Sequence, residues 1–185
     1  MISLFPSVDY FACDIAPQML AQSKIPADRA LVGRVHEISF PRDRFDFIFS
    51  LGVTSYQSRQ ELSEAWGFIG ERLAPGGVAV ISFTNRASID HALRHALKIA
   101  KPFIKRGVFG QPFETYAYKA SEVEEMSRRA GLVVSRTAYL NQTFTPFNSI
   151  LPRPSVALAK LIERHAPNAM LSADFIAFVT RPGST

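Results

Sequence analysis

Residues 59–83 have the sequence RQELSEAWGFIGERLAPGGVAVISF, in which the spacing of apolar residues changes from that of a helix to that of a strand. In the first half, apolar side chains recur every three or four residues, at Leu62, Ala65, Trp66, Ile69 and Leu73. This spacing predicts an amphipathic helix over 59–73. Pro75-Gly76-Gly77 interrupts the helix, and the apolar run over 78–83 that follows is typical of a buried parallel strand.

The same alternation extends over the rest of the chain. Further strands are expected at 8–13, 30–32, 45–51, 132–135 and 175–179, and further helices after Pro17, over 88–106 and 121–130, and near 155–165. Alternating strands and helices predict an α/β fold with a mostly parallel sheet and helices on both faces. Residues 1–185 are expected to form a single domain. Because ligands bind beyond the carboxyl ends of such strands, a site is expected after Cys13, Val32, Leu51 and Phe83.

The composition is that of an ordinary globular protein, with 47% hydrophobic and 20% charged residues. No apolar run reaches the roughly 18 residues of a membrane-spanning helix, and the first residues lack the basic start of a secretion signal, so a cytoplasmic location is expected. Cys13 is the single cysteine and no cysteine or histidine cluster has metal-ligand spacing, so no metal site is predicted. The net charge of +5 is concentrated in 94–106, so no nucleic-acid partner is expected.

Four segments, in this order, carry a resemblance to a known family. They are YFACDIAPQMLAQSK (10–24), VGRVHEISFPRDRFDFIFS (32–50), LAPGGVAVISF (73–83) and the run Ala130-Gly131-Leu132-Val133. In order and spacing they resemble successive strands and turns of the class I S-adenosylmethionine-dependent methyltransferases, from about Val8 to Arg136. The resemblance implies a Rossmann-like methyltransferase sheet and S-adenosylmethionine as the cofactor.

The first of these segments supplies three candidate cofactor-binding residues. By resemblance, Asp14 stands at the end of the strand that corresponds to the family's second strand, and it binds the ribose of the cofactor. A carboxylate can accept hydrogen bonds from both vicinal hydroxyls of a ribose. A second interpretation is that Asp14 bonds only the amides of the helix that begins near Pro17. Ile15 and Met19 resemble the apolar contacts to the adenine face, and their alternative is packing in the core.

Four more candidates follow the next two strands. Arg34 stands where the family usually has an acidic residue that meets the adenine amino group, and arginine has no acceptor for that contact. The backbone N–H of Val35 can still meet a ring nitrogen of adenine. Ser50 and Leu51 stand where the family lines the methionine end of the cofactor with backbone groups.

The family's first strand and its Gly-x-Gly-x-Gly loop have no counterpart in this sequence. Only seven residues precede Val8, and none is glycine. An N-terminally truncated gene or misassigned start, a fragment and a degenerate non-catalytic relative are the three explanations. Without the central first strand, the strands at 8–13 and 45–51 are expected to leave open sheet edges that favour self-association. Methyl-donor binding, and therefore activity, is expected to be impaired.

Two long connections, 86–120 and 138–172, are expected to cover the substrate side. The first holds a basic amphipathic helix over 88–106, and both hold aromatic residues, which suggests a lid over a small apolar or aromatic molecule. Peripheral membrane contact through 88–106 is a second interpretation, and ordinary packing is a third. His91, His95, Tyr56 and Tyr116 are candidates for a general base, but no catalytic residue is assigned.

The function that follows from the resemblance is S-adenosylmethionine-dependent methyl transfer to a small, apolar or aromatic acceptor. Two alternatives stay open at this point. A non-catalytic methyltransferase-like subunit would keep the fold and lose the donor site. A fragment of a nucleotide-dependent oxidoreductase would share the parallel sheet and the acid after its second strand.

Overall fold

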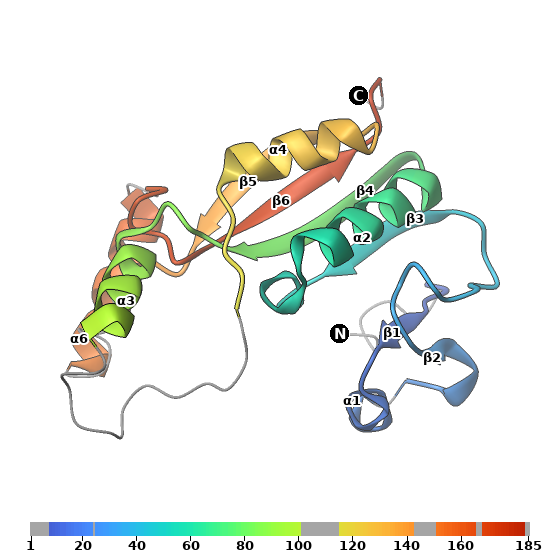
Figure 1. Ribbon diagram of the computed structural model, residues 1–185, viewed down its shortest axis with the longest axis horizontal. Helices are drawn as coiled ribbons and strands as arrows, with labels where there is room; N and C mark the ends of the chain where they lie inside the picture. The colour runs from blue at the N-terminus through green and yellow to red at the C-terminus, as the bar shows by residue number, and fades with distance from the viewer. Residues whose placement is uncertain (1–7, 24, 101–114, 143–150, 166–167, 184–185) are drawn as a thin grey trace. The chain divides into compact units, whose positions relative to one another are not determined.

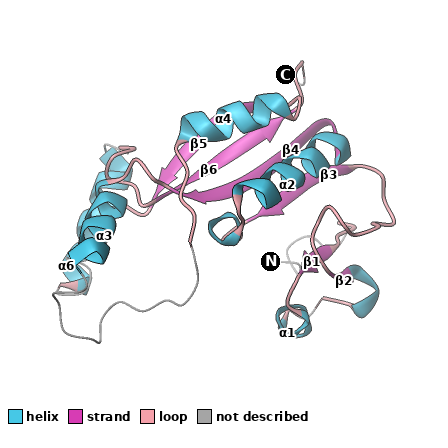
Figure 2. Ribbon diagram, in the orientation of Figure 1, coloured by secondary structure: helices cyan, strands magenta, loops and turns pink. Residues whose placement is uncertain are grey.

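The structure is a computed structural model that describes residues 8–23, 25–100, 115–142, 151–165 and 168–183 (Figures 1 and 2). The chain divides into two compact units, Met1–Arg44 and Phe45–Thr185. Each unit has its own sheet, and each is described by itself.

The first unit is built on two short parallel strands. Its elements are β1 (Ala12–Asp14), α1 (Pro17–Gln22), the 3₁₀ turn η2 (Ala27–Arg29) and β2 (Ala30–Val32). Pro17 stands at the first position of α1, where its missing N–H leaves no helical hydrogen bond unmade. The strand expected at 8–13 is shorter than predicted. The side chain of Asp9 pairs with those of Arg29 and Arg42, at 3.0 and 3.1 Å, which ties the residues before β1 to η2 and to the segment after β2.

The second unit contains a four-stranded sheet in the order β3-β4-β6-β5. Its strands are β3 (Phe45–Ser50), β4 (Leu73–Thr84), β5 (Val133–Leu140) and β6 (Asp174–Thr180). Its helices are η3 (Thr54–Tyr56), α2 (Arg59–Arg72), α3 (Ile89–Ala100), α4 (Ala120–Arg129) and α6 (Pro152–His165). β3 and β4 are parallel, whereas β6 is antiparallel to both of its neighbours. The predicted α/β fold is confirmed, but the sheet of this unit is mixed and not mostly parallel, since two of its three strand pairings are antiparallel. Self-association through sheet edges stays a prediction.

In this unit two strands, β4 and β5, differ from their predicted limits by more than one residue. β4 begins at Leu73 and not at 78, because Leu73 already pairs with Phe45. The Pro75-Gly76-Gly77 segment is therefore an irregularity inside the strand, where the register between β3 and β4 shifts. β5 runs on to Leu140, so the connection expected from 138 begins only after this strand.

The core lies between this sheet and two helices, α2 and α4, that pack on one of its faces (Figure 1). Trp66 of α2 and Val123 of α4 are buried against alternate residues of the two central strands, such as Phe83 and Phe175. Gly70 of α2 lies so close to the chain after α4 that an added Cβ would sit 2.5 Å from the carbonyl oxygen of Ala130. The apolar residues whose spacing predicted this helix therefore form the face of α2 that packs on the sheet.

A buried asparagine holds the connection between α6 and β6. The Asn85 side chain follows β4 and donates to the carbonyl oxygens of Ala169 and Ser172, at 2.7 and 2.9 Å. The helix predicted over 88–106 is described as α3 only to Ala100, and the rest of it lies outside the described residues. In the part of the chain that the structure describes, every helix is too short or too polar to cross a membrane.

Candidate functional site

The first unit brings its predicted site residues to one edge of its sheet. Asp14 ends β1 and pairs with Val32 at the end of β2, and Ile15 and Arg34 follow these two ends. Because β1 and β2 are parallel, their carboxyl ends meet at the same edge. The Gly33 N–H donates to the carbonyl oxygen of Asp14 at 3.0 Å, which closes the two ends against each other.

One of the two oxygens of the Asp14 carboxylate accepts a hydrogen bond from the neighbouring backbone. One oxygen, Oδ1, accepts from the backbone N–H of Ala16 at 2.8 Å, and Ala16 is the residue that precedes α1. The hydrogen bond between Asp14 and an amide at the start of the following helix, which was the second interpretation of this residue, is therefore present. The second oxygen, Oδ2, has no hydrogen-bond partner among the described residues, so it can accept from a ligand.

Apolar side chains lie exposed beside this carboxylate. Ile15 and Met19 are 70% and 59% exposed, and Leu20 is the buried residue of α1. Ile15 and Met19 therefore do not pack in the core of the first unit. Arg34 is exposed and Val35 is partly buried, so both remain at the edge where they were expected.

The second unit holds the loop after β3 tightly against β4. Ser50 is partly buried and Leu51 is 51% exposed. Just after them, the Gly52 N–H donates to the Ser82 hydroxyl at 2.8 Å, and the buried Thr54 hydroxyl donates to the Ser82 carbonyl oxygen at 2.6 Å. Gly52 has a φ of +74°, a conformation that glycine adopts without strain. One residue of β4 thus positions the carboxyl end of its neighbour.

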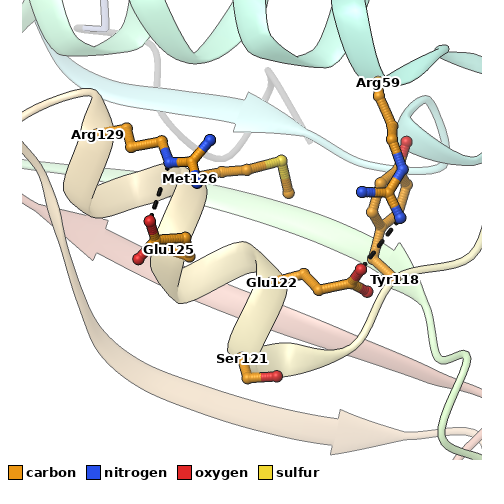
Figure 3. Close-up of a pocket in the computed structure, with 7 residues that line it drawn as sticks. All are labelled: Arg59, Tyr118, Ser121, Glu122, Glu125, Met126 and Arg129. Atoms are coloured by element: carbon orange, nitrogen blue, oxygen red, sulfur yellow. Dashed lines mark hydrogen bonds and ion pairs between the residues drawn. The ribbon is translucent and has the colours of Figure 1, made fainter.

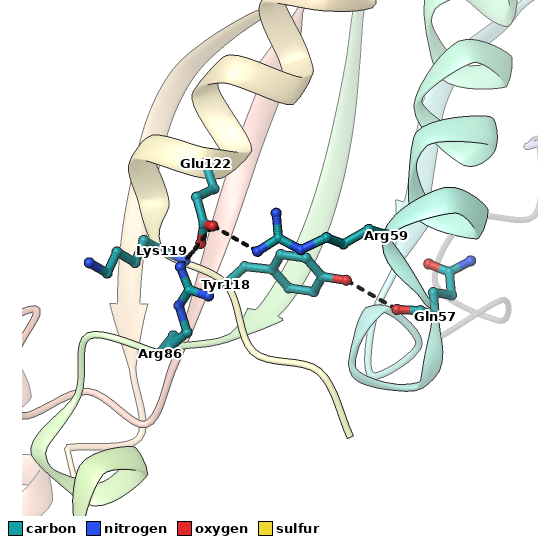
Figure 4. Close-up of polar contacts among 6 residues, drawn as sticks. All are labelled: Gln57, Arg59, Arg86, Tyr118, Lys119 and Glu122. Atoms are coloured by element: carbon teal, nitrogen blue, oxygen red, sulfur yellow. Dashed lines mark hydrogen bonds and ion pairs between the residues drawn. The ribbon is translucent and has the colours of Figure 1, made fainter. Parts of the chain in front are cut away.

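A distant segment, residues 116–118, crosses between the ends of these two strands. The Tyr116 N–H donates to the Ser55 carbonyl oxygen at 2.8 Å, and the Tyr118 N–H donates to that of Thr84 at 2.9 Å. The buried Tyr118 ring reaches back, and its hydroxyl donates to the Gln57 carbonyl oxygen at 3.0 Å (Figure 4). Burial raises the pKa of Tyr118, which keeps this phenol protonated as a donor.

Glu122, near the start of α4, gathers three donors at this crossing (Figure 4). Its carboxylate accepts from the Lys119 N–H at 2.8 Å and pairs with Arg86 at 2.8 Å and with Arg59 at 3.1 Å. Burial acts to raise the pKa of Glu122, but the Lys119 hydrogen bond and the two arginines outweigh it, and the pKa is lowered. The acid ties the start of α2, the end of β4 and the start of α4 together.

Sequence reasoning did not identify Arg59, Arg86 or Glu122. An acid in the first turn of a helix is a recognisable capping signal, and Glu122 lies in the first turn of the helix predicted over 121–130, so a backbone contact near its start could have been predicted. Its pairing with Arg59 joins positions 63 residues apart in the chain. No local spacing indicates such a contact.

A pocket of about 300 Å³ lies beside this cluster, between α2 and α4 (Figure 3). Its lining residues are Arg59, Tyr118, Ser121, Glu122, Glu125, Met126 and Arg129. Arg129 pairs with Glu125 at 2.9 Å, and Arg59 pairs with Glu122 at 3.1 Å. The charges of the pocket therefore neutralise one another, and they leave no net charge to select an ionic ligand.

His91 and His95 lie one turn apart on α3, with ring centroids 6.5 Å apart. Burial lowers the pKa of His91, and the nearby His95, Arg86 and Arg94 lower it further. The neutral imidazole that results can accept a proton. Groups of three or more potential metal ligands are absent from the residues that the structure describes.

Comparison with known proteins supplies a family for part of the chain. Residues 3–81, which run from before β1 into β4, match a family described as a methyltransferase domain. None of the curated proteins matches the sequence.

Many solved structures share the fold. An S-adenosylmethionine-dependent methyltransferase from Archaeoglobus fulgidus has a TM-score of 0.60 at 12% identity, covering 96% of this chain and 79% of that one. Magnesium protoporphyrin IX methyltransferase from Synechocystis PCC 6803, solved with bound SAH, has 0.58 at 11%, covering 97% and 68%. A methyltransferase in complex with the Trm112 methyltransferase activator of Haloferax volcanii has 0.60 at 16%, covering 97% and 76%. At these identities the likeness concerns the fold alone.

Proposed function

We propose that this chain is a class I S-adenosylmethionine-dependent methyltransferase that methylates a small, apolar or aromatic acceptor. The methyltransferase-domain match over residues 3–81 and the shared fold support this proposal. We take its two units to be parts of one domain. S-adenosylmethionine supplies an electrophilic methyl group on a sulfonium. The protein has mainly to hold donor and acceptor in line, since proximity and alignment lower the barrier of such a displacement.

The observation that supports the donor site is the Oδ2 atom of Asp14, which has no partner among the described residues and lies beside exposed apolar side chains. A carboxylate oxygen suits a ribose hydroxyl, and Ile15 and Met19 suit the face of an adenine. The backbone N–H of Val35 suits a ring nitrogen. Arg34 departs from the usual acid, so adenine would be held there without a side-chain acceptor.

Ser50 and Leu51 are proposed to line the methionine end of the donor. Leu51, Val53 and Tyr56 are 51%, 44% and 57% exposed, and all three follow β3. Tyr116 comes to the same strand end through its bond to Ser55. Apolar and aromatic side chains at this edge favour an apolar or aromatic acceptor. His91 is available as a proton acceptor if the methylated group is a hydroxyl.

The test measures donor affinity by calorimetry. Residues 1–185 contain no Gly-x-Gly segment, so we expect weak donor binding by these residues alone. A fusion that places a methyltransferase first strand and Gly-x-Gly-x-Gly loop before residue 1 should bind S-adenosylmethionine. In this fusion Asp14→Asn should weaken binding by roughly 1.5–3 kcal/mol, the scale of a charged hydrogen bond.

Asn is chosen because its amide oxygen can still accept from Ala16, so the start of α1 is preserved. Asp28→Asn, an exposed acid of η2 in the same unit, is the matched control and should leave affinity unchanged. An Asp14→Asn protein that binds the donor as tightly as its parent would show that Asp14 only caps the helix.

A further inference from the structure

Helix α6 shows two different faces. On the inner side Ser155 and Ala159 are buried and Ile162 is partly buried. Glu163 accepts from the backbone N–H of Asn141 at 3.0 Å, which fastens the helix to the end of β5. Because this acid is the only one in α6, the outward side of the helix carries no negative charge.

The outward side of α6 carries leucines. Leu158 and Leu161, three residues apart, are 42% and 57% exposed, and Leu151 just before the helix is 46% exposed. Residues at this spacing lie on one side of a helix. Three exposed leucines on and just before one helix form an apolar surface patch, which is more stable when an apolar partner covers it than when it faces water.

A row of cations runs beside these leucines. Arg153, Lys160 and Arg164 are spaced by seven and four residues, so they share one side of α6, and all three are exposed. None of them forms an ion pair with any residue that the structure describes. This contrasts with the arginines of α4, since Arg128 and Arg129 both pair with Glu125.

We propose that α6 docks on an anionic lipid surface, with its leucines in the interface and its cations at the phosphate headgroups. A helix with exposed leucines beside lysine and arginine has the chemistry that such surfaces bind. The positive net charge of the chain, +5, acts in the same direction. A second copy of the chain is a poorer occupant, since a twofold contact would bring the two rows of cations together.

Docking of α6 on a lipid surface would also bring the proposed acceptor site close to that surface. This part of the inference rests on the proposed function. Leu140, before α6, and Thr84, at the carboxyl end of β4, both pair with Asp174 at the start of β6. The helix therefore follows the sheet edge at which the acceptor site is proposed. An apolar acceptor dissolved in the bilayer would reach the enzyme at that edge.

The experiment is cosedimentation of residues 1–185 with vesicles, without donor or acceptor, so its outcome does not depend on methyl transfer. Vesicles of phosphatidylglycerol and phosphatidylcholine should bind the protein, and vesicles of phosphatidylcholine alone should not. Binding should fade as salt is added. Arg153→Gln/Lys160→Gln/Arg164→Gln should weaken it roughly tenfold or more, and Leu158→Ser/Leu161→Ser should weaken it as well.

Two matched controls separate the surface of α6 from general effects. Arg128→Gln/Arg129→Gln/Arg136→Gln removes the same charge from α4 and β5 and should bind far better than the α6 triple variant. Val133→Ser changes an exposed apolar residue of β5 and should bind as the parent does. Circular dichroism checks that every variant is folded.

Three results would overturn the proposal. The first is absence of binding to the anionic vesicles by the folded parent. The second is equal loss of binding in the α6 and control triple variants, which would assign the effect to net charge. The third is a parent dimer that Leu158→Ser/Leu161→Ser converts to a monomer, which would show that a second copy covers the leucines.

Discussion

Removing the carboxylate of Glu122 should loosen the crossing of chain at the carboxyl ends of β3 and β4. In the native protein it accepts from the Lys119 N–H and pairs with Arg59 and Arg86. Glu122→Ala loses all three contacts. Glu122→Gln keeps an oxygen that can accept from Lys119 and loses only the charge.

The expected magnitudes follow from the exposure of each partner. The side chains of Arg59 and Arg86 are 68% and 37% exposed, so each ion pair is worth about 0.2–1 kcal/mol. The hydrogen bond at the start of α4 adds about 1 kcal/mol. Glu122→Ala should therefore lower the free energy of unfolding by about 1.5–3 kcal/mol, and Glu122→Gln by about half as much.

Urea unfolding measures these differences, and Glu125→Ala is the matched control. Glu125 lies on the same helix and also pairs with two arginines, but among the described residues no backbone N–H donates to it. Its loss should be the smallest of the three. If Glu122→Ala and Glu125→Ala destabilise the protein equally, the three-way contact at Glu122 does not hold the crossing together.

The same carboxylate should make stability depend on acid. Because the pKa of Glu122 is lowered in the folded protein, its contribution is fully present above its usual pKa of about 4.5 and is lost as pH falls through the lowered value. The difference between the parent and Glu122→Gln should therefore shrink below about pH 4.5. A difference that stays constant down to low pH would contradict the lowered pKa.

Two further predictions concern α2 and α3. On α2, Gly67→Ala should stabilise by about 0.5–1 kcal/mol because its Cβ would have no atom of the described residues within 4 Å. Gly70→Ala should destabilise because its Cβ would lie 2.5 Å from the Ala130 carbonyl oxygen, and equal melting temperatures for the two variants would refute this packing. On α3, burial lowers the pKa of His91, so protonation favours the unfolded chain and stability should fall as pH drops below about 6.5. His91→Gln should flatten that slope in urea unfolding, and an unchanged slope in this variant would count against the buried imidazole.

The helices and most strands of this protein could be predicted because their signals are local. The apolar spacing over 59–73 gave the buried face of α2, and Ala30–Val32 was predicted with the bounds that β2 has. Asp14 was placed at a strand end by the residues around it alone. Where the prediction missed, as at the start of β4, the cause is a partner strand: Leu73 is in the sheet because Phe45 lies beside it.

The contacts that shape the candidate site belong to the tertiary structure. The sequence determined which residues form strands and helices, since hydrophobic spacing and turn residues act within a few positions of one another. Only the folded chain decided that β6 runs antiparallel to its neighbours, that residues 116–118 lie between two strand ends, and that Glu122 meets Arg59 and Arg86. These depend on the order in which strands pair, and that order brings together groups far apart in the chain.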